Sequence, residues 1–583
     1  MNTHQPIEKN LSHNHSFINN WSVKKIGVIG PGIVGMPMAA LLANARIKIG
    51  NDKPAEVVVI QRNSRFSGWK VDAINSGQST IGGIEPGLDE IVSNLVKEKL
   101  LRASHNYSEL TDADVILVCV QTDKKGFEPD YGPLFESLTN LAEVLQNKPK
   151  EKVPLIIFES TLAPSTMNTL IKDHFKKYGL VDGENILLGN SPNRVMPGRL
   201  VERVTTSDKL VGGLNSLTPK LIHKLYSHIV TKGELSQTNS ITAEIIKTFE
   251  NAYRDVRIAF SSEIVRFCDE NDINFYKVRD EVNKLRGQTD NASKVFNAVP
   301  VGGMLVPTLG VGGHCLPKDG ILLWWRKIQA DSDTSLSLIL NARKINDESP
   351  QKTIELAERK FGDLSGKKIG LLGAAYRFNS EDTRNSPTLV LADLLLKKNC
   401  EVKIHDPFVK PGDQNILKYG FENIFTNDID EVLNFSNYLF ICTAHNFYFE
   451  NKDKIFDSGA SGIIDACNIY SEDITKNHFN RYTGIGRGRK DPDQEFIDFV
   501  FNSYRVVERG VANELSNLVE FFNKNYANDE FNKINFKEVQ RLAAGCGTGC
   551  IIDDPGELNE IPIYKGYSSL LADYAVNSQL LNV

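Results

Sequence analysis

The sequence predicts an α/β protein in which two doubly wound parallel sheets are joined by a long central helix and a helical dimerisation region, with a C-terminal extension beyond them. Two observations predict this class. Apolar segments of strand length alternate with segments of helical periodicity over residues 24–177 and again over residues 367–464, which is typical of parallel sheets with helices on both faces. Between these stretches, residues 240–271 carry apolar side chains at helical spacing.

Composition excludes several classes of function. The 583 residues predict about three or four domains. A net charge of -6 without a basic stripe argues against nucleic-acid binding, and no apolar run reaches the roughly 18–20 residues of a membrane span. Most cysteines stand singly within apolar segments, and the N-terminal tail lacks the apolar core of a secretory signal. We therefore expect a cytoplasmic protein.

The first α/β region is assigned from its short apolar segments and from the helical patterns between them. We expect strands at 24–29, 57–60, 115–120 and 155–158, and helices at 33–45, 133–145 and 165–177.

The central helix has a broad apolar face, to which Ile245, Phe249, Val256 and Phe260 contribute. A helix of this length usually connects domains or forms a subunit interface. We therefore expect a homodimer or a higher homo-oligomer.

A second α/β region and an extension complete the chain. We expect strands at 368–372, 401–405, 438–442 and 462–464, a helix at 386–396, a linker at 486–491 and a further helix at 495–522. The predicted divisions are a disordered tail (1–22), a dinucleotide-binding domain (23–238), a central helical domain with a cysteine loop (239–350), a second Rossmann-like domain (351–488) and the extension (489–583).

The first motif is a glycine-rich turn at 30–35 that follows a predicted strand and opens a predicted helix. Its glycines allow a tight turn and a close approach to a pyrophosphate, and the helix N-terminus supplies N–H donors. The motif predicts that a dinucleotide is bound by Gly30, Gly32, Ile33, Val34 and Gly35.

The choice between NAD and NADP depends on the end of the second strand, where an acidic residue normally binds the adenosine ribose. This sequence has Gln61 and Arg62 there. Gln61 can bond a ribose hydroxyl, whereas Arg62 and Arg65 can hold a 2′-phosphate. NAD is favoured, and NADP stays open.

The second motif is a cysteine in a glycine-rich loop at 310–319. Its glycines are expected to leave room for a substrate beside Cys315, and His314 or Lys318 can favour the thiolate. Asp319 can position a base or a water molecule. The pattern predicts a nucleophilic cysteine.

Lys247 and Asn251 form a third constellation. They lie four residues apart on the predicted central helix and therefore share one face. An ammonium and an amide directed at one oxygen atom are suited to stabilising an oxyanion.

Together these motifs resemble the UDP-glucose/GDP-mannose dehydrogenase family over about residues 24–488. The segments at 191–198 and 250–260 look most like the branch that oxidises UDP-N-acetylmannosamine, with UDP-N-acetylglucosamine and UDP-glucose as alternative substrates. Further similar segments follow in the same order at 111–122, 159–161, 247–260 and 382–387.

The resemblance implies an NAD-dependent, four-electron oxidation of the C6 alcohol of a UDP-hexose to a uronate. Cys315 would carry the sugar as a thiohemiacetal and then as a thioester. Lys247 and Asn251 would stabilise oxyanions, and Asp319 would assist proton movement. The resemblance also assigns Gln61, Arg62, Thr122 and Thr161 to the cofactor, and Arg194, Arg254, Arg377 and Arg384 to the substrate. No metal is implied.

One departure concerns the hydrolysis of the thioester. The family usually has glutamate after its Ser-Pro pair, where this chain has Asn193. Asparagine can orient water but cannot accept its proton. Glu159 or Asp319 is the expected substitute; without one, the thioester would accumulate. Arg377 stands where relatives often have lysine, and it keeps the positive charge.

Two other functions are compatible with parts of the sequence. A single-step hydroxyacid or phosphogluconate-type dehydrogenase would share the first domain and the helical middle but would need neither Cys315 nor a second α/β region. A non-catalytic nucleotide-sugar sensor is suggested by Asn193 and by the extension. In that extension, Cys546 and Cys550 are too few for a metal site.

Overall fold

The computed structural model describes residues 17–195, 198–298, 300, 302–330, 333–335, 337–545, 549–558 and 560–579. The chain divides into two compact units. Unit 1 contains residues 1–250, 321–332 and 517–547, and unit 2 contains residues 251–320, 333–516 and 548–583. Three helices contribute residues to both units, so the central region and the extension are each divided between them: α9 (Ser240–Asn271), α11 (Leu316–Gln329) and α20 (Gln494–Tyr526).

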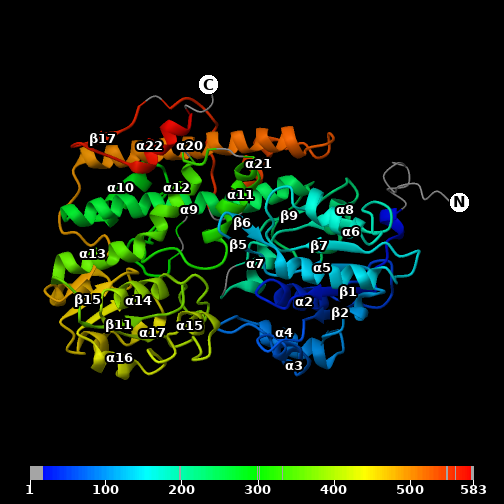
Figure 1. The fold of residues 1–583 in the computed structure, drawn as a ribbon, viewed down its shortest axis with the longest axis horizontal. Helices are drawn as coiled ribbons and strands as arrows, with labels where there is room; N and C mark the ends of the chain where they lie inside the picture. The colour runs from blue at the N-terminus through cyan, green and yellow to red at the C-terminus, as the bar shows by residue number, and fades with distance from the viewer. Residues whose placement is uncertain are drawn as a thin grey trace. The chain divides into compact units, whose positions relative to one another are not determined.

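Unit 1 is built on an eight-stranded sheet with the order β10-β9-β8-β7-β4-β1-β2-β3 (Figure 1). Along the sheet, the neighbouring strands β3, β2, β1, β4, β7 and β8 pair in parallel, whereas β8 and β9 pair in antiparallel orientation. The strands are β1 (Lys25–Ile29), β2 (Glu56–Ile60), β3 (Leu101–Ser104), β4 (Val115–Val118), β7 (Leu155–Phe158), β8 (Leu187–Asn190), β9 (Lys209–Gly213) and β10 (Leu235–Asn239).

Both faces of this sheet are covered, as a doubly wound fold requires. Along β4, Val115 and Leu117 pack into one apolar cluster, and Ile116 and Val118 pack into a second cluster on the opposite face. The covering elements are α2 (Gly35–Asn44), α3 (Trp69–Asn75), α4 (Leu88–Lys97), η2 (Tyr107–Leu110), α5 (Gly132–Leu145), the π-helical η3 (Met167–Ile171), α6 (Lys172–Lys176), α7 (Leu200–Thr206) and α8 (Thr218–Tyr226); unit 1 also contains β5 (Asp123–Lys125), β6 (Glu128–Asp130) and α21 (Phe536–Ala544).

Unit 2 contains a six-stranded parallel sheet with the order β13-β12-β11-β14-β15-β16 (Figure 1). In the order of their appearance along the chain, these strands follow the 3-2-1-4-5-6 arrangement of dinucleotide-binding folds. The strands are β11 (Lys368–Leu372), β12 (Glu401–His405), β13 (Phe425–Thr426), β14 (Tyr438–Ile441), β15 (Gly462–Asp465) and β16 (Tyr482–Gly484).

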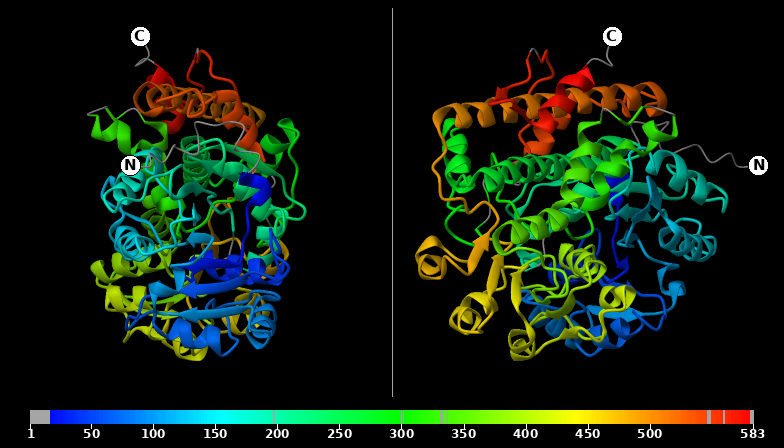
Figure 2. Two further views of the ribbon diagram at one scale, coloured as in Figure 1. Left: turned by 90° about the vertical axis from the view of Figure 1, so that its right-hand side faces the viewer. Right: turned by 60° about the vertical axis from the view of Figure 1, so that its left-hand side comes forward.

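Helices pack around this second sheet, and further helices lie beside α9 (Figure 2). They are α10 (Phe275–Leu285), α12 (Leu338–Asp347), α13 (Ser349–Phe361), α14 (Pro387–Lys397), α15 (Gln414–Tyr419), α16 (Ile429–Phe435), α17 (Asn446–Glu450), α18 (Lys452–Phe456), α19 (Glu472–Thr475), η4 (Lys476–His478) and α22 (Leu570–Gln579), with a small hairpin of β17 (Ile563–Tyr564) and β18 (Tyr567–Ser568). The two wound sheets and the long helix confirm the predicted fold class.

The ends of the predicted elements differ modestly from the observed ones. The predicted helix at 165–177 is a π-helical turn followed by a short α-helix. The N-terminal segment is described from residue 17, with residues 17–20 helical and Trp21 buried; the earlier part of the predicted tail lies outside the described residues.

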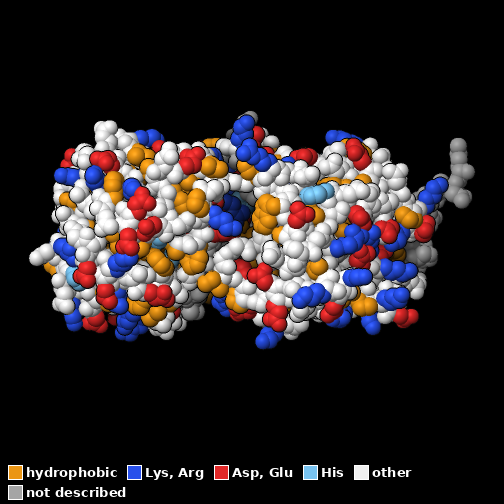
Figure 3. Space-filling view, turned by 90° about the horizontal axis from the view of Figure 1, so that it is seen from below, with side chains coloured by type: hydrophobic (Ala, Val, Ile, Leu, Met, Phe, Trp, Pro, Cys, Tyr) orange, Lys and Arg blue, Asp and Glu red, His pale blue; other side chains and the backbone are white. Residues whose placement is uncertain are grey.

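The described helices include none that is both long enough and apolar enough to cross a membrane. On the face shown in Figure 3, lysine and arginine side chains are interspersed with acidic ones.

Candidate active site

The glycine turn after β1 has the geometry that a dinucleotide needs. Gly30 has a φ of +89°, a conformation that side chains disfavour. A Cβ on Gly35 would lie 2.1 Å from the Gly30 carbonyl oxygen, so this glycine lets α2 pack closely against the turn. A Cβ on Gly32 would meet nothing within 4 Å. The turn is therefore tight on its inner side and open at Gly32, which fits a bound pyrophosphate.

This turn lies at the point where the strand order reverses, between β1 and β4. Ligands of open α/β sheets bind at this position. Thr122 follows β4, and its hydroxyl donates to the carbonyl oxygen of Thr161 at 2.7 Å. The structure thus brings two residues assigned to the cofactor together at the same edge of the sheet.

The two residues at the end of β2 already have partners within the protein. The amide of Gln61 donates to the Ser67 hydroxyl at 2.9 Å. Arg62 pairs with Glu136 at 3.1 Å in a largely exposed ion pair. Because Glu136 neutralises Arg62, this position offers little excess positive charge to a 2′-phosphate, which favours NAD.

Glu159 lies at the end of β7 in a buried polar network. Its carboxylate accepts hydrogen bonds from the Asn193 amide at 2.8 Å, from the Lys209 ammonium at 2.8 Å and from the Tyr226 hydroxyl. Lys209 also donates to the Ser191 carbonyl oxygen at 2.9 Å. Burial lowers the pKa of Lys209 and raises that of Tyr226. The structure therefore brings together the two residues, Glu159 and Asn193, that the sequence connects with thioester hydrolysis.

Arg194 and Lys247 differ in how they are engaged. The Arg194 guanidinium forms a buried ion pair with Glu250 and also donates to the Asp208 and Leu542 carbonyl oxygens at 2.9 and 3.3 Å. Lys247 is buried on α9, and no carboxylate of the described residues forms an ion pair with its ammonium. Lys247 thus retains a charge that can be offered to an oxyanion.

In unit 2, Cys315 stands immediately before the first residue of α11 and is exposed. Its carbonyl oxygen accepts from the Lys318 and Asp319 N–H groups at 3.1 and 2.9 Å, which closes the first turn of the helix. A helix N-terminus carries partial positive charge and favours an anionic group. Of the described cysteines, Cys315 is the one classed as exposed.

Behind Cys315 lies a buried polar triad. One Asp319 oxygen accepts from the Asn251 amide at 2.6 Å, and the other accepts from the Lys318 ammonium at 2.7 Å. The side chains of Asp319 and Lys318 are 0% and 2% exposed. Lys318 therefore forms a buried ion pair with Asp319, and Asp319 in turn fixes the amide of Asn251.

Two glycines of the cysteine loop, Gly312 and Gly313, lie against Tyr376. A Cβ on Gly312 would lie 2.4 Å from Cβ of Tyr376, and one on Gly313 would lie 2.8 Å from its ring. The two glycines thus make room for Tyr376, which follows β11. The Gly313 N–H also donates to the Arg384 carbonyl oxygen at 2.8 Å, so the loop is attached to the second sheet.

The remaining arginines assigned to the substrate are all in unit 2. Arg384 pairs with Asp382 through Nε and Nη2, which leaves its Nη1 edge outside the pair. Arg377 lies over the ring of Phe378, and Arg254 is half-buried on α9. Arg377 and Arg384 follow β11, at the reversal of the second sheet's strand order.

Sequence reasoning missed the buried partners of these residues. Lys209 lies on β9 and Tyr226 on α8, and both are distant from Glu159 in the sequence. Tyr376 lies in a loop that is distant from Cys315 in the sequence. A lysine within the apolar segment of β9 is the one local signal, since a buried lysine needs a partner.

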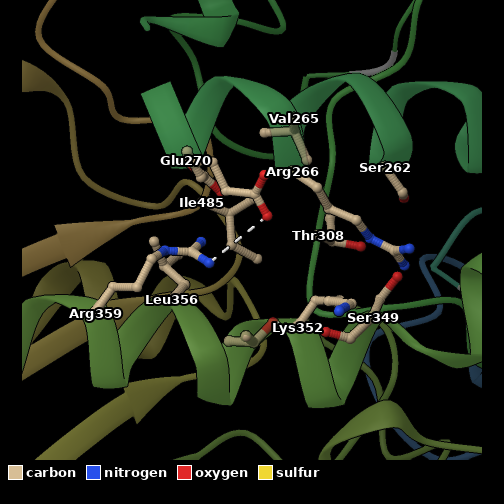
Figure 4. A pocket seen from close by; sticks show the side chains of 12 residues that line it. Ser262, Val265, Arg266, Glu270, Thr308, Ser349, Lys352, Leu356, Arg359 and Ile485 are labelled. Carbon is tan, nitrogen blue, oxygen red and sulfur yellow. Dashed lines mark hydrogen bonds and ion pairs between the residues drawn. The ribbon is translucent and has the colours of Figure 1, made fainter. Parts of the chain in front are cut away.

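A separate pocket lies between α9 and α13 (Figure 4). It contains none of the residues assigned to the cofactor, substrate or chemistry. Its three cations already have partners: Arg266 pairs with Glu348 at 3.1 Å, Lys352 with Glu355 at 2.9 Å, and Arg359 with Glu270 at 4.0 Å. We assign no function to it.

Cys546 lies outside the described residues, and Cys550 is buried. Within the described part of the chain, no cluster of three or more acidic, histidine or cysteine side chains is arranged to hold a metal.

Three family models match the chain in succession. They are those of the UDP-glucose/GDP-mannose dehydrogenase family for its NAD binding domain (residues 24–230), its central domain (241–348) and its UDP binding domain (370–472). The chain belongs to the UDP-glucose/GDP-mannose dehydrogenase family. It is an NAD-dependent dehydrogenase, and this argues against the hypothesis of a non-catalytic sensor. Its second sheet argues against the hypothesis of a single-step dehydrogenase, which would not need one.

Individual relatives agree with this assignment. The UDP-N-acetyl-D-mannosamine dehydrogenase of Pyrococcus horikoshii is 30% identical over 472 residues, which are 80% of this chain and 99% of the relative. A solved structure of the enzyme from P. horikoshii has a TM-score of 0.66 at 29% identity, covering 80% of this chain and 99% of that one. The NDP-N-acetyl-D-galactosaminuronic acid dehydrogenase of Methanosarcina mazei Go1 has a TM-score of 0.64 at 30% identity, covering 82% and 98%.

Proposed function

We propose that the protein oxidises the C6 alcohol of UDP-N-acetylmannosamine to the uronate, with Cys315 as the covalent nucleophile. The names of the relatives from P. horikoshii and Escherichia coli K12, each 30% identical, support this sugar. The similar structure from M. mazei is named for a galacto-configured uronic acid, so the epimer depends on pocket contacts rather than on the fold. UDP-N-acetylglucosamine and UDP-glucose are the alternative substrates.

The exposed thiol of Cys315 at the N-terminus of α11, with the Asn251–Asp319–Lys318 triad behind it, is the observation that carries the proposal. A buried lysine–aspartate pair costs desolvation energy. Here it holds the amide of Asn251 in one orientation. Asn251 can therefore donate its other N–H to an oxygen that develops negative charge.

The chain's residues act in sequence on the sugar carbon. Two NAD molecules, bound one after the other, would each accept one of the two hydrides that this carbon loses. The Cys315 sulfur adds to the aldehyde carbon, forming a C–S bond, and the carbonyl oxygen becomes an oxyanion that Asn251 and Lys247 stabilise. When the thiohemiacetal loses its hydroxyl proton and the second hydride, a thioester remains. Water then breaks the C–S bond and releases the carboxylate and the thiol.

Hydrolysis of the thioester is the step that the replacement of the usual glutamate by Asn193 affects. The Asn193 amide donates to Glu159, and Glu159 also accepts from a lysine and a tyrosine. Three donors thus occupy the Glu159 carboxylate, so we propose that Glu159 holds Asn193 and that Asn193 orients the water. Sustained uronate production would support this role; a burst of NADH without turnover would show that water activation fails.

The stoichiometry of cofactor reduction tests the proposed function. We expect two NADH per sugar with UDP-N-acetylmannosamine, and a screen with UDP-N-acetylglucosamine and UDP-glucose, each with NAD and NADP, ranks the alternatives. Cys315→Ser should abolish uronate formation. Cys400→Ser, which replaces a buried thiol in another part of unit 2, should not. A Cys315→Ser variant that retains most of its activity would reject covalent catalysis.

A cytoplasmic location and a homo-oligomeric assembly stay predictions of the sequence. No disulfide joins two of the described cysteines, which supports a reducing compartment. The predicted assembly depends on the apolar face of α9.

A further inference from the structure

The part of α9 in unit 2 is covered by the C-terminal extension. The ring of Phe260 stacks on Tyr504 of α20 at 5.0 Å, and the ring of Phe267 stacks on Tyr567 of β18 at 4.4 Å. Phe267 also contacts Phe496 at the start of α20. In Figures 1 and 2, the first part of α20 runs along α9. The face of α9 expected to meet another subunit is therefore buried within one chain.

Buried polar groups connect the same two helices. The Arg257 guanidinium donates to the Tyr504 hydroxyl at 3.0 Å and to the Gly549 carbonyl oxygen at 3.0 Å. The Tyr253 hydroxyl donates to Glu508 of α20 at 3.0 Å, and Glu508 pairs at 2.7 Å with Arg286, the residue that follows α10. The Glu508 side chain is 7% exposed. Separating the helices would leave these groups unpaired, which is costly.

The extension and the helices before it also supply hydrogen-bond acceptors to the first N–H groups of each other's helices. Glu263 of α9 accepts from the Ser569 hydroxyl and the Leu571 N–H at the start of α22. In return, Glu514 of α20 accepts from the Ser337 hydroxyl at 2.6 Å and the Leu338 N–H at 2.9 Å, at the start of α12. The first N–H groups of a helix require such partners. This reciprocal arrangement indicates permanent docking rather than a mobile flap.

The relatives form their fold without this segment. The match to the P. horikoshii relative takes in 99% of that protein with 80% of this chain, and the last family model ends at residue 472. The segment that contains α20, α22 and the β17–β18 hairpin lies after that point.

We infer that the C-terminal extension takes the place of a second copy of the chain on α9. A long helix with an apolar face needs a covering surface, and obligate homodimers supply one that resembles a domain core. Here residues of α20, β18 and α22 supply it. The protein therefore does not self-associate through residues 253–267 of α9, and any oligomer forms through another surface.

Hydrogen exchange of the full chain tests this inference. The protein is diluted a hundredfold, and its molecular mass is measured in parallel by light scattering. Peptides from 253–267 and from the first half of α20 should keep the same protection against exchange at every concentration, whatever that mass is. Protection of 253–267 that falls as a dimer dissociates would overturn the inference.

A matched pair of variants tests the covering role directly. Glu514→Ala removes the acceptor at the start of α12, whereas Glu520→Ala removes an exposed carboxylate from the same helix. We expect Glu514→Ala to increase exchange in α20 and α9 and to strengthen self-association at least tenfold, with Glu520→Ala matching the wild type. Increased exchange of α9 without stronger self-association would contradict the inference.

A conservative variant covers the case in which Glu514→Ala does not fold. Tyr253→Phe keeps the ring and removes the hydroxyl that donates to Glu508. Faster exchange together with stronger self-association supports the inference, and faster exchange without stronger self-association contradicts it.

Discussion

The ion pair of Lys209 and Glu159 gives the sharpest test of the site in unit 1. The two side chains are 5% and 0% exposed, and their charged atoms are 2.8 Å apart. Lys209→Met leaves Glu159 with two neutral donors in a buried place. Breaking a buried pair from one side costs about 3–5 kcal/mol. Because the Asn193 and Tyr226 donors remain, we expect the lower end, about 3 kcal/mol.

A double-mutant cycle separates this ion pair from general packing. Lys209→Met combined with Glu159→Gln removes both charges, so the double variant should be more stable than the sum of the two single changes predicts, with a coupling of about 2 kcal/mol. Urea unfolding followed by circular dichroism measures it. The control is the exposed pair of Arg46 and Glu98 in the same unit, where the coupling should stay below about 1 kcal/mol. Additivity within about 0.5 kcal/mol at Lys209 and Glu159 would refute the reasoning.

Three further predictions follow from other contacts. Gly35→Ala places a methyl group 2.1 Å from the Gly30 carbonyl oxygen and should weaken NAD binding at least tenfold in a titration of NADH fluorescence; unchanged affinity would show that the turn can yield. Asn251→Ala removes an oxyanion donor and should lower kcat by about 100–1,000-fold with little change in KM; a change confined to KM would indicate a binding role. Burial raises the pKa of Glu263 from 4.5 to about 7, and hydrogen bonds from the Leu570 and Leu571 N–H groups oppose the shift. The folded state then holds a proton that the unfolded chain has lost, so this contribution to stability is complete below the unfolded pKa and is lost as the pH rises to about 7, by about 3 kcal/mol. Comparing the urea midpoints of wild type and Glu263→Gln at about pH 5 and about pH 8 checks the sign, and a parallel pH dependence would contradict it.

Local patterns predicted much of this molecule because each depends on one element. The glycines at 30–35 describe a turn whose shape depends on those residues, and the structure has that turn at the reversal of the strand order. The apolar periodicity of 240–271 predicted α9 with the same ends as observed. The spacing of Lys247 and Asn251 required only a continuous helix.

Long-range partners were beyond the reach of such patterns. The periodicity of α9 shows that one face is buried but not what buries it, and the predicted partner was a second subunit. The glycines at 312 and 313 signal a close approach, yet only the fold shows that the approaching group is Tyr376.

The sequence by itself therefore determined the wound sheets, the cofactor turn, the cysteine at a helix start and the length of the central helix. Tertiary structure alone decided that Lys209 neutralises Glu159, that Lys318 and Asp319 hold Asn251, and that the extension covers α9. The physical reason is that hydrophobic burial leaves a periodic trace within one segment, whereas a hydrogen bond or ion pair between distant segments leaves no trace until both have been placed.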